Sequence, residues 1–269
     1  MKKEYIIPIF VPHLGCKQCC TFCNQRTISG EKKQVTAKDV EETIEYYLKN
    51  FKDDKKYVEV AFFGGSFTAI ERETQEELLT AVQPYLKNKK IDSIRISTRP
   101  DAIDKQILKI LKQYHVKTIE LGVQSTNNYI LEKCKRGHNF EDVKKASKLI
   151  RFYGFNLGHQ MMVGLPESSE KEDIQTAKDL IKLNPKMVRI YPVLVIKGTQ
   201  LETEYNNGDF TPLTVGQAVE RSKEILKLFN KKKIQVIRVG LQNTDTITDP
   251  TGKGSEVVTG PQLYPNRSL

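Results

Sequence analysis

The chain has 269 residues, 38% of them hydrophobic, which is enough for one large α/β domain or two small ones. No apolar run reaches the length of a membrane span and the N-terminus lacks a signal-peptide core, so we expect a cytoplasmic protein with no membrane partner. The 43 lysines and arginines outnumber the 33 acidic residues, and the net charge of +10 favours a polyanionic partner such as nucleic acid; a lysine-rich solvated surface is the alternative.

Apolar strands and helices alternate over the first 200 residues. Strands are predicted at 5–12, 57–63, 93–98, 118–123, 156–163 and 187–196. Helices are predicted at 36–49, 73–83, 101–114, 139–153 and 171–183, with a short one after the fourth strand. Thr36 opens the first helix, Pro84 is expected to end or kink the second, and Asp101 is expected to cap the third. Repeated strand–helix alternation predicts right-handed crossovers and a parallel sheet.

The alternation changes after residue 196. A loop rich in Asn and Gly leads to a predicted helix at 214–230 and a strand at 234–241. The stretch from Asn243 onward is polar, rich in Thr, Gly and Pro, and is expected to be irregular. We therefore divide the chain into residues 1–200 and a C-terminal extension, 201–269, which packs on the first part and is not an independent domain.

The loop after the first strand carries a group of cysteines. Cys16, Cys20 and Cys23 stand in a C-x3-C-x2-C pattern, with the aromatic Phe22 before the last. Thiolates on one short loop can bind a soft metal centre, and a [4Fe–4S] cluster normally takes four of them, one for each iron. Three thiolates without an obvious fourth would leave one iron open to another ligand.

Two structural alternatives involve the neighbouring Cys19. Four cysteines on one loop could hold a zinc ion, but Cys19 and Cys20 are adjacent and lack the paired spacing of zinc knuckles. A disulfide is less favoured because nothing marks the chain as secreted. We interpret Cys19 as a spectator or a minor modulator, and Cys134 as a small apolar core residue and not a fourth ligand.

A C-x3-C-x-aromatic-C motif just after an N-terminal apolar strand resembles that of the radical S-adenosylmethionine (SAM) enzymes. The resemblance implies a partial (β/α)6 TIM-like barrel with a C-terminal helix–strand extension, and functional residues at the strand ends. It also implies that SAM chelates the open iron, and that an electron from the reduced cluster cleaves SAM to a 5′-deoxyadenosyl radical, which abstracts hydrogen from a substrate. The electron donor implied is a flavodoxin or ferredoxin.

Motifs near the later strand ends narrow the resemblance to one branch of the family. They are R-P-D at 99–101, E-L-G-V-Q-S at 120–125, R-G-H at 136–138, M-M-V-G-L-P at 161–166 and Y-P-V-L-V-I-K-G-T at 191–199. Together they resemble the catalytic subunit of Elongator and its short bacterial relatives, over residues 5 to about 260. This implies modification of tRNA or another RNA. Modification of a small molecule and non-catalytic RNA binding by a degenerate barrel stay open as alternatives, and the three cysteines argue against the second.

The resemblance assigns five contacts to SAM. Gly64, Gly65 and Ser66 stand where the family has a Gly-Gly motif that binds the amino end of SAM through backbone groups, which glycine permits because it has no Cβ. The alternative is an ordinary tight turn. Gln124 and Arg136 correspond to contacts with the SAM ribose and carboxylate, and the planar guanidinium suits a carboxylate. An exposed cation at a helix start is the alternative for Arg136.

Other polar residues near these motifs have less specific roles. Ser97 and Gln160 stand where related enzymes often carry a carboxylate directed at SAM or the substrate. Glu120 is expected to be buried, where it either pairs with a basic residue or acts in the chemistry. His138 is expected to hold a loop, and His159 points either inward to the substrate or outward, because side chains alternate along a strand.

Elongator-type enzymes continue after the barrel into an acetyltransferase domain and keep zinc ligands near that junction. The present sequence has no late cysteine and no such domain before Leu269. We therefore expect either different chemistry or a piece of a longer protein.

The cysteine spacing predicts which residues hold the cluster. After anaerobic reconstitution the wild-type chain should contain about four irons, as a cysteine-ligated cube requires. Iron and sulfide analysis should show loss of the cluster in three single variants and its retention in two others. The cluster is lost in Cys16→Ala, Cys20→Ala and Cys23→Ala, and kept in Cys19→Ala and Cys134→Ala. Stoichiometric zinc without iron would favour the zinc site instead.

Overall fold

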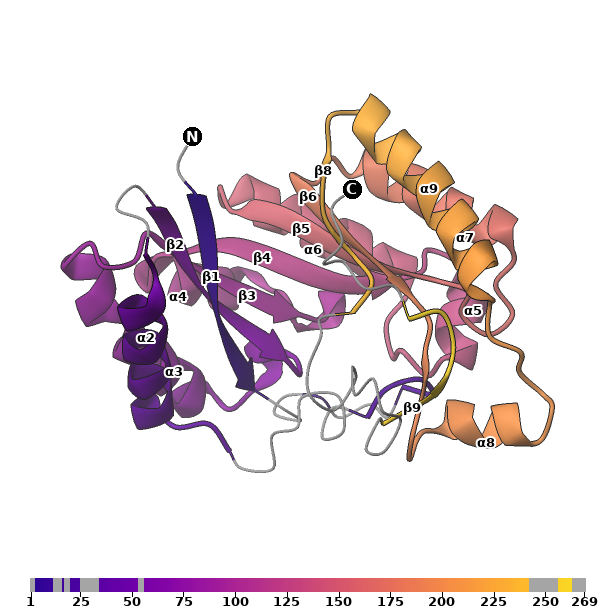
Figure 1. The fold of residues 1–269 in the computed structure, drawn as a ribbon. Helices are drawn as coiled ribbons and strands as arrows, with labels where there is room; N and C mark the ends of the chain where they lie inside the picture. Colours follow the sequence, from indigo (N-terminus) through magenta and orange to yellow (C-terminus); the bar gives the residue numbers. More distant parts are fainter. Residues whose placement is uncertain are drawn as a thin grey trace.

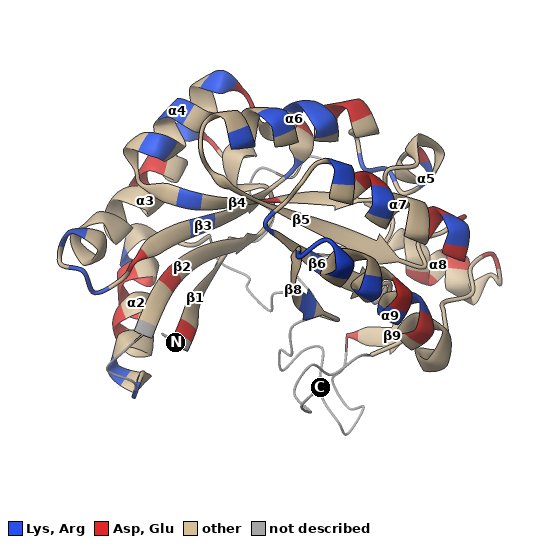
Figure 2. Ribbon diagram, turned by 90° about the horizontal axis from the view of Figure 1, so that it is seen from above, with Lys and Arg blue, Asp and Glu red and all other residues tan. Residues whose placement is uncertain are grey.

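The structure is a computed structural model that describes residues 3–11, 16, 20–24, 34–52, 56–241 and 256–262. Within these ranges, seven parallel strands form one sheet that curls into a half-barrel, with helices on its convex side (Figures 1 and 2). A short antiparallel pair lies apart from this sheet. No helix in the described part of the chain is both long enough and apolar enough to span a bilayer.

The order of strands in the sheet follows the sequence. The strands are β1 (Lys3–Val11), β2 (Lys56–Gly64), β3 (Ser93–Thr98), β4 (Val116–Gln124), β5 (Asn156–Val163), β6 (Met187–Pro192) and β8 (Gln235–Val239). Each strand pairs in parallel with the next, so every connection must cross over one face. The predicted α/β half-barrel is therefore confirmed, and β8 adds a seventh strand beside β6.

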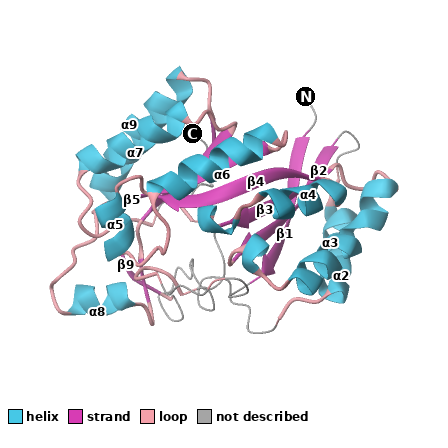
Figure 3. Ribbon diagram, turned by 180° about the vertical axis from the view of Figure 1, so that it is seen from behind, coloured by secondary structure: helices cyan, strands magenta, loops and turns pink. Residues whose placement is uncertain are grey.

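The helices fill these crossovers. They are α2 (Ala37–Asn50), α3 (Arg72–Lys87), α4 (Lys105–Gln113), α5 (Asn128–Lys133), α6 (Phe140–Phe152), α7 (Glu170–Lys182), α8 (Gln200–Asn206) and α9 (Val215–Lys231). Seen from behind, α4 and α6 lie over the outer face of the sheet (Figure 3). The helix α9 packs beside α7. This arrangement leaves the concave face and the carboxyl ends of the strands free for a site.

Side-chain caps begin several helices where the sequence predicted them. Thr36 and Asp39 form a reciprocal capping box at the start of α2, and Asn139 and Asp142 form another at the start of α6. These caps satisfy backbone N–H groups that the first turn leaves without partners. They explain why these two boundaries could be read from local sequence.

The predictions for two helix boundaries have different outcomes. Pro84 does not end α3, which continues to Lys87; the next residue, Tyr85, packs against the core and favours this last turn. A kink at Pro84 stays a prediction. Asp101 does not cap α4: its carboxylate pairs with Arg99, in a short 3-10 turn, and Asp104 caps the helix instead.

The predicted strand at 187–196 is divided. The strand β6 ends at Pro192, and the separate β7 (Val195–Ile196) pairs antiparallel with β9 (Val257–Thr259). Proline cannot donate to a strand ladder, which favours this interruption. The loop predicted after residue 196 contains α8, which Thr199 caps. The remainder of the predicted irregular segment, 242–255 and 263–269, lies outside the described residues.

A ladder of buried ion pairs crosses the concave face of the sheet. Arg95 on β3 binds Glu59 on β2, with Nη2 2.5 Å from Oε2, and Glu120 on β4, with Nη1 2.6 Å from Oε1. Arg189 on β6 binds the other oxygen of Glu120 at 2.7 Å. Gln160 on β5 donates to the same oxygen at 2.9 Å. Glu120 is thus a structural anchor that joins four strands.

The environment of Glu120 keeps it ionised. Burial alone would raise the pKa of this 1% exposed carboxyl, but Arg189 and Arg95 outweigh it and lower the pKa to about 2. Because its pKa is lowered on folding, the stabilisation by Glu120 is complete above the ordinary carboxyl pKa. It is lost as the pH falls from about 4.5 towards 2.

Removal of this carboxylate should destabilise the fold. In Glu120→Ala two buried arginines lose their shared partner, and we expect the free energy of unfolding to fall by about 3–5 kcal/mol. The control is Glu220→Ala, which removes an exposed carboxylate paired with Lys223 and should change the value by about 0–1 kcal/mol. Urea unfolding at pH 7 measures both. Equal losses in the two variants would contradict the proposed role of the ladder.

Candidate functional site

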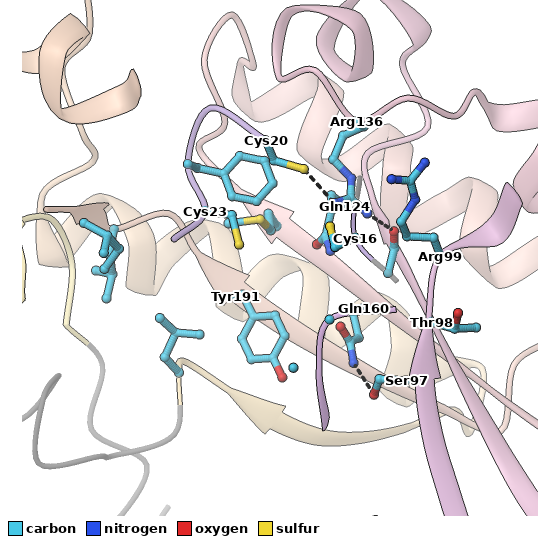
Figure 4. A pocket seen from close by; sticks show the side chains of 18 of the residues that line it. Cys16, Cys20, Cys23, Ser97, Thr98, Arg99, Gln124, Arg136, Gln160 and Tyr191 are labelled. Atoms are coloured by element: carbon cyan, nitrogen blue, oxygen red, sulfur yellow. Dashed lines mark hydrogen bonds between the residues drawn. The ribbon is translucent and has the colours of Figure 1, made fainter. Parts of the chain in front are cut away.

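A cavity opens at the carboxyl ends of the strands, lined by the strand ends and the cysteine loop (Figure 4). Most of the residues singled out in the sequence meet there. The lining includes Cys16, Cys20, Cys23, Gly64, Gly65, Ser97, Thr98, Arg99, Gly122, Gln124, Arg136, Gln160, Met162 and Tyr191. Parallel strands bring these distant segments together because all their carboxyl ends point the same way.

The predicted cluster cysteines share this cavity, and their loop is fastened to two helices. The backbone N–H of Thr21 donates to the Cys134 carbonyl at the end of α5, and Leu201 at α8 donates to the Thr21 carbonyl. Cys20 and Cys23 are also joined through their backbones, at 3.0 Å. These bonds fix the direction from which two thiols enter the cavity.

The structure describes only one of the two remaining cysteines. Cys134 is fully buried and does not line the cavity, and burial raises the pKa of its thiol to about 12. Cys19 lies outside the described residues. Among the described residues, no three His, Cys, Asp or Glu side chains converge closely enough for a single metal ion. A cubic cluster needs no such convergence, because each thiolate binds a different iron.

The turn after β2 requires glycine. Gly64 has φ +109°, and a Cβ at this position would lie 2.9 Å from the Val11 carbonyl oxygen. The next residue, Gly65, donates its N–H to the same oxygen at 3.0 Å. The ends of β1 and β2 are therefore locked together, and two glycines line the cavity at this turn.

Ser66 differs from its two neighbours. Its side chain is fully buried, lies 2.8 Å from the Thr98 hydroxyl, and accepts a hydrogen bond from the Arg99 N–H at 3.1 Å. It does not line the cavity. The hydroxyl thus ties the turn after β2 to the end of β3, and a contact of Ser66 with a cofactor through its backbone stays a prediction.

The end of β4 is irregular where it meets the cavity. The pairing with β5 shifts register between Gly122 and Gln124, and Gln124 has φ +70°, in the left-handed region. Such bulges and strained residues concentrate at functional sites. The Oε1 atom of Gln124 is buried and has no hydrogen-bond partner among the described residues. It is therefore an acceptor available to a molecule bound in the cavity.

Arg136 enters the cavity from the segment after α5. It is 7% exposed, so the alternative of an exposed cation is wrong. Its Nη2 donates to the Gly122 carbonyl at 2.6 Å and its Nη1 to the Cys20 sulfur at 3.1 Å, while Nε has no partner in the described structure. No carboxylate of the described residues forms an ion pair with it. Since a buried charge without a counter-ion is costly, the site favours a bound anion.

The floor of the cavity is polar but lacks acidic groups. Because the ionised Glu120 can only accept, the amide nitrogen of Gln160 must face it, and this nitrogen also lies 3.3 Å from the Ser97 hydroxyl. Burial raises the pKa of the nearby Tyr191 phenol. None of the residues that line the cavity is Asp or Glu, whereas Arg99 and Arg136 are cationic. The site is therefore electropositive.

His138 and His159, two of the four histidines of the chain, have structural roles. His138 lies 3.3 Å from the Val123 carbonyl and holds its loop to β4, as predicted; burial and then Arg136 lower its pKa to about 4. The inward orientation considered for His159 is wrong. Its Nε2 lies 2.9 Å from Ser147 on α6, on the outer face of the sheet, because Gln160 and Met162 take the inner positions of the strand.

The residues present fit a cluster and a SAM molecule. Three thiols share a cavity with a buried donor, Arg136 Nε, and a buried acceptor, Gln124 Oε1, both lacking partners among the described residues. A carboxylate and a hydroxyl group would satisfy these two atoms. Sequence reasoning missed Arg99 as a lining residue, although its place at the end of β3 pointed to this edge of the sheet.

Comparison with known proteins decides the family. The sequence model of the radical SAM superfamily matches residues 10–180, and that of the radical SAM C-terminal domain matches residues 185–262. The chain belongs to the radical SAM superfamily. It is therefore an enzyme, and its cofactors are those of the family, a [4Fe–4S] cluster and SAM.

Several relatives carry the narrower resemblance. An uncharacterized protein of Methanocaldococcus jannaschii, MJ0486, is 33% identical over 229 residues, which are 81% of this chain and 70% of that protein. The tRNA uridine(34) acetyltransferase of Methanocaldococcus infernus is 32% identical over 61% of this chain and 34% of its own length. Elongator complex protein 3 of Homo sapiens is 27% identical over 64% of this chain and 35% of its own length. The chain thus spans about a third of the latter two proteins.

Solved structures confirm the fold. The archaeal Methanocaldococcus infernus Elp3 aligns with a TM-score of 0.74 at 24% identity, over 98% of this chain and 60% of that one. Coproporphyrinogen III oxidase (HemN) of Escherichia coli aligns with a TM-score of 0.60 at 16% identity, over 86% of this chain and 53% of that one. The half-barrel is thus shared with solved structures of low sequence identity.

Proposed function

We propose that this chain cleaves SAM reductively in the cavity and directs the resulting radical to tRNA or another RNA. The observation that carries the proposal is that Cys16, Cys20 and Cys23 share one cavity with the unsatisfied polar atoms of Gln124 and Arg136. The three cysteines would hold the cluster. When bound, the reduced cluster supplies one electron that splits SAM into methionine and a 5′-deoxyadenosyl radical. A flavodoxin or ferredoxin would deliver this electron.

The chain's own residues would bind and orient SAM. Arg136 Nε would donate to the SAM carboxylate, and Gln124 Oε1 would accept from a ribose hydroxyl. The backbone of Gly65 would lie against the amino end, since no Cβ blocks the approach there. Phe22 and Met162 line the same cavity and would exclude water from a reactive radical.

An RNA substrate is supported by charge and by the named relatives. The chain carries a net charge of +10. Lysines stand on the outer surfaces of α4 and α6 (Figure 2), among them the exposed Lys105, Lys109, Lys145 and Lys148. Such cations can contact phosphates, and the relatives named for tRNA uridine(34) acetylation act on such a polyanion. Lysines on the convex surface would position the RNA, whereas recognition of a base requires the cavity itself.

The SAM contacts can be tested by binding measurements on the reconstituted protein. Arg136→Ala should weaken SAM binding by about 1.5–3 kcal/mol, the range for a hydrogen bond to a charged group. Gly65→Val should remove measurable binding, because its side chain would occupy the space of the ligand, while the iron content stays normal. The control Gln113→Ala changes an exposed residue at the end of α4 and should bind as the wild type does. Wild-type affinity for SAM in both Arg136→Ala and Gly65→Val would contradict the placement of SAM.

The substrate can be tested by adding RNA to the SAM cleavage assay. With dithionite as reductant, the reconstituted protein should release 5′-deoxyadenosine, and bulk tRNA should increase the amount. Binding of tRNA should weaken steeply as the salt concentration rises, because phosphate contacts release counter-ions. Heparin is the matched polyanion control and should not increase cleavage. If tRNA leaves cleavage unchanged and heparin displaces it fully, modification of a small molecule becomes the better reading.

A further inference from the structure

Two arginines contact the sulfur atoms of the proposed cluster ligands. Nη1 of Arg136 donates to the sulfur of Cys20 at 3.1 Å (Figure 4). Burial opposes the charged form of Arg99, but hydrogen bonding and charge interactions with Asp101 and then with Cys16 raise the pKa of its guanidinium. The two cations come from different segments, the end of β3 and the residues after α5. Cys20 therefore has a cationic donor, and Cys16 interacts with a second cation.

Both guanidinium groups are held in place by other bonds. Asp101 binds Arg99 through both oxygens, at 2.9 and 2.5 Å, and the Arg99 side chain is only 11% exposed. The Gly122 carbonyl holds Arg136 at 2.6 Å. Asp101 also neutralises part of the charge of Arg99, whereas Arg136 has no ion-pair partner among the described carboxylates. Arg136 should therefore exert the stronger field on the sulfur atoms.

The consequence follows from the charge of a reduced cluster. Reduction adds a negative charge to a group already held by three thiolates. Hydrogen bonds to the sulfurs and nearby positive charge stabilise that added electron, and they are among the factors that set the reduction potential. In a buried site such interactions are screened little.

We propose that Arg136 and Arg99 raise the reduction potential of the cluster by donating hydrogen bonds to the sulfurs of Cys20 and Cys16. The inference rests on the proposed assignment of these cysteines as ligands. This role of Arg136 is compatible with its proposed contact with SAM, because different nitrogen atoms serve the two: Nη1 donates to the Cys20 sulfur, and Nε stays available to SAM. Both arginines would therefore make the cluster easier to reduce.

The test measures the midpoint potential of the cluster in the absence of SAM. The full chain is reconstituted anaerobically and titrated with dithionite, and the electron paramagnetic resonance signal of the reduced cluster is followed. In Arg136→Gln the equilibrium constant for reduction should fall at least tenfold, which is 59 mV for a one-electron couple. In Arg99→Gln the fall should be smaller, because Asp101 offsets part of that charge.

The matched control is Arg151→Gln, which removes the same charge from an exposed position on α6. Its midpoint should equal that of the wild type. Midpoints of Arg136→Gln and Arg99→Gln that also equal the wild-type value would overturn the inference. If Arg136→Gln retains no iron, Arg99→Gln decides, and an unchanged midpoint in that variant would overturn the inference. Absence of a cluster in the wild type would instead refute the proposed function, whereas normal SAM cleavage with unchanged midpoints would refute this inference alone.

Discussion

The ion pairs around Glu120 are the interaction on which the inner face of the half-barrel depends. A barrel interior is usually filled by branched apolar side chains, but here Arg95 and Arg189 flank one carboxylate and bridge β3, β4 and β6. The buried charges tolerate this position only because each has its partner. The same carboxylate fixes the amide of Gln160 and so shapes the floor of the cavity above it. The Glu120 carboxylate therefore contributes both to the stability of the fold and to the geometry of the site.

Three local features of the backbone at the strand ends bring the functional side chains together. The glycine turn at Gly64 locks β1 to β2, the register shift near Gln124 alters the end of β4, and the cysteine loop is fastened to α5 and α8. Each feature is local, but each lies at the edge of the sheet where all the parallel strands end. The cavity is thus the meeting point of segments that are distant in sequence.

The electrostatic character of the site is consistent with its proposed ligands. Arg99 and Arg136 line a cavity whose walls carry no carboxylate, so the bound groups must supply the negative charge. A thiolate-held cluster and the carboxylate of SAM would both supply such charge. Arg136 donates to the Cys20 sulfur and keeps a buried nitrogen without a partner among the described residues, so under the proposals above one side chain would act in both cofactor binding and electron transfer.

The sequence by itself determined the alternation of strands and helices, the six strands of the barrel and the cysteine pattern, because hydrophobic periodicity, caps and short motifs are local. Only the tertiary structure decided which way buried polar side chains point. Arg136 and Cys20 are 116 positions apart and Arg189 and Glu120 are 69 apart, so no local pattern records their contact. His159 faces α6 for the same reason: strand alternation allows two faces, and only the packed helix selects one.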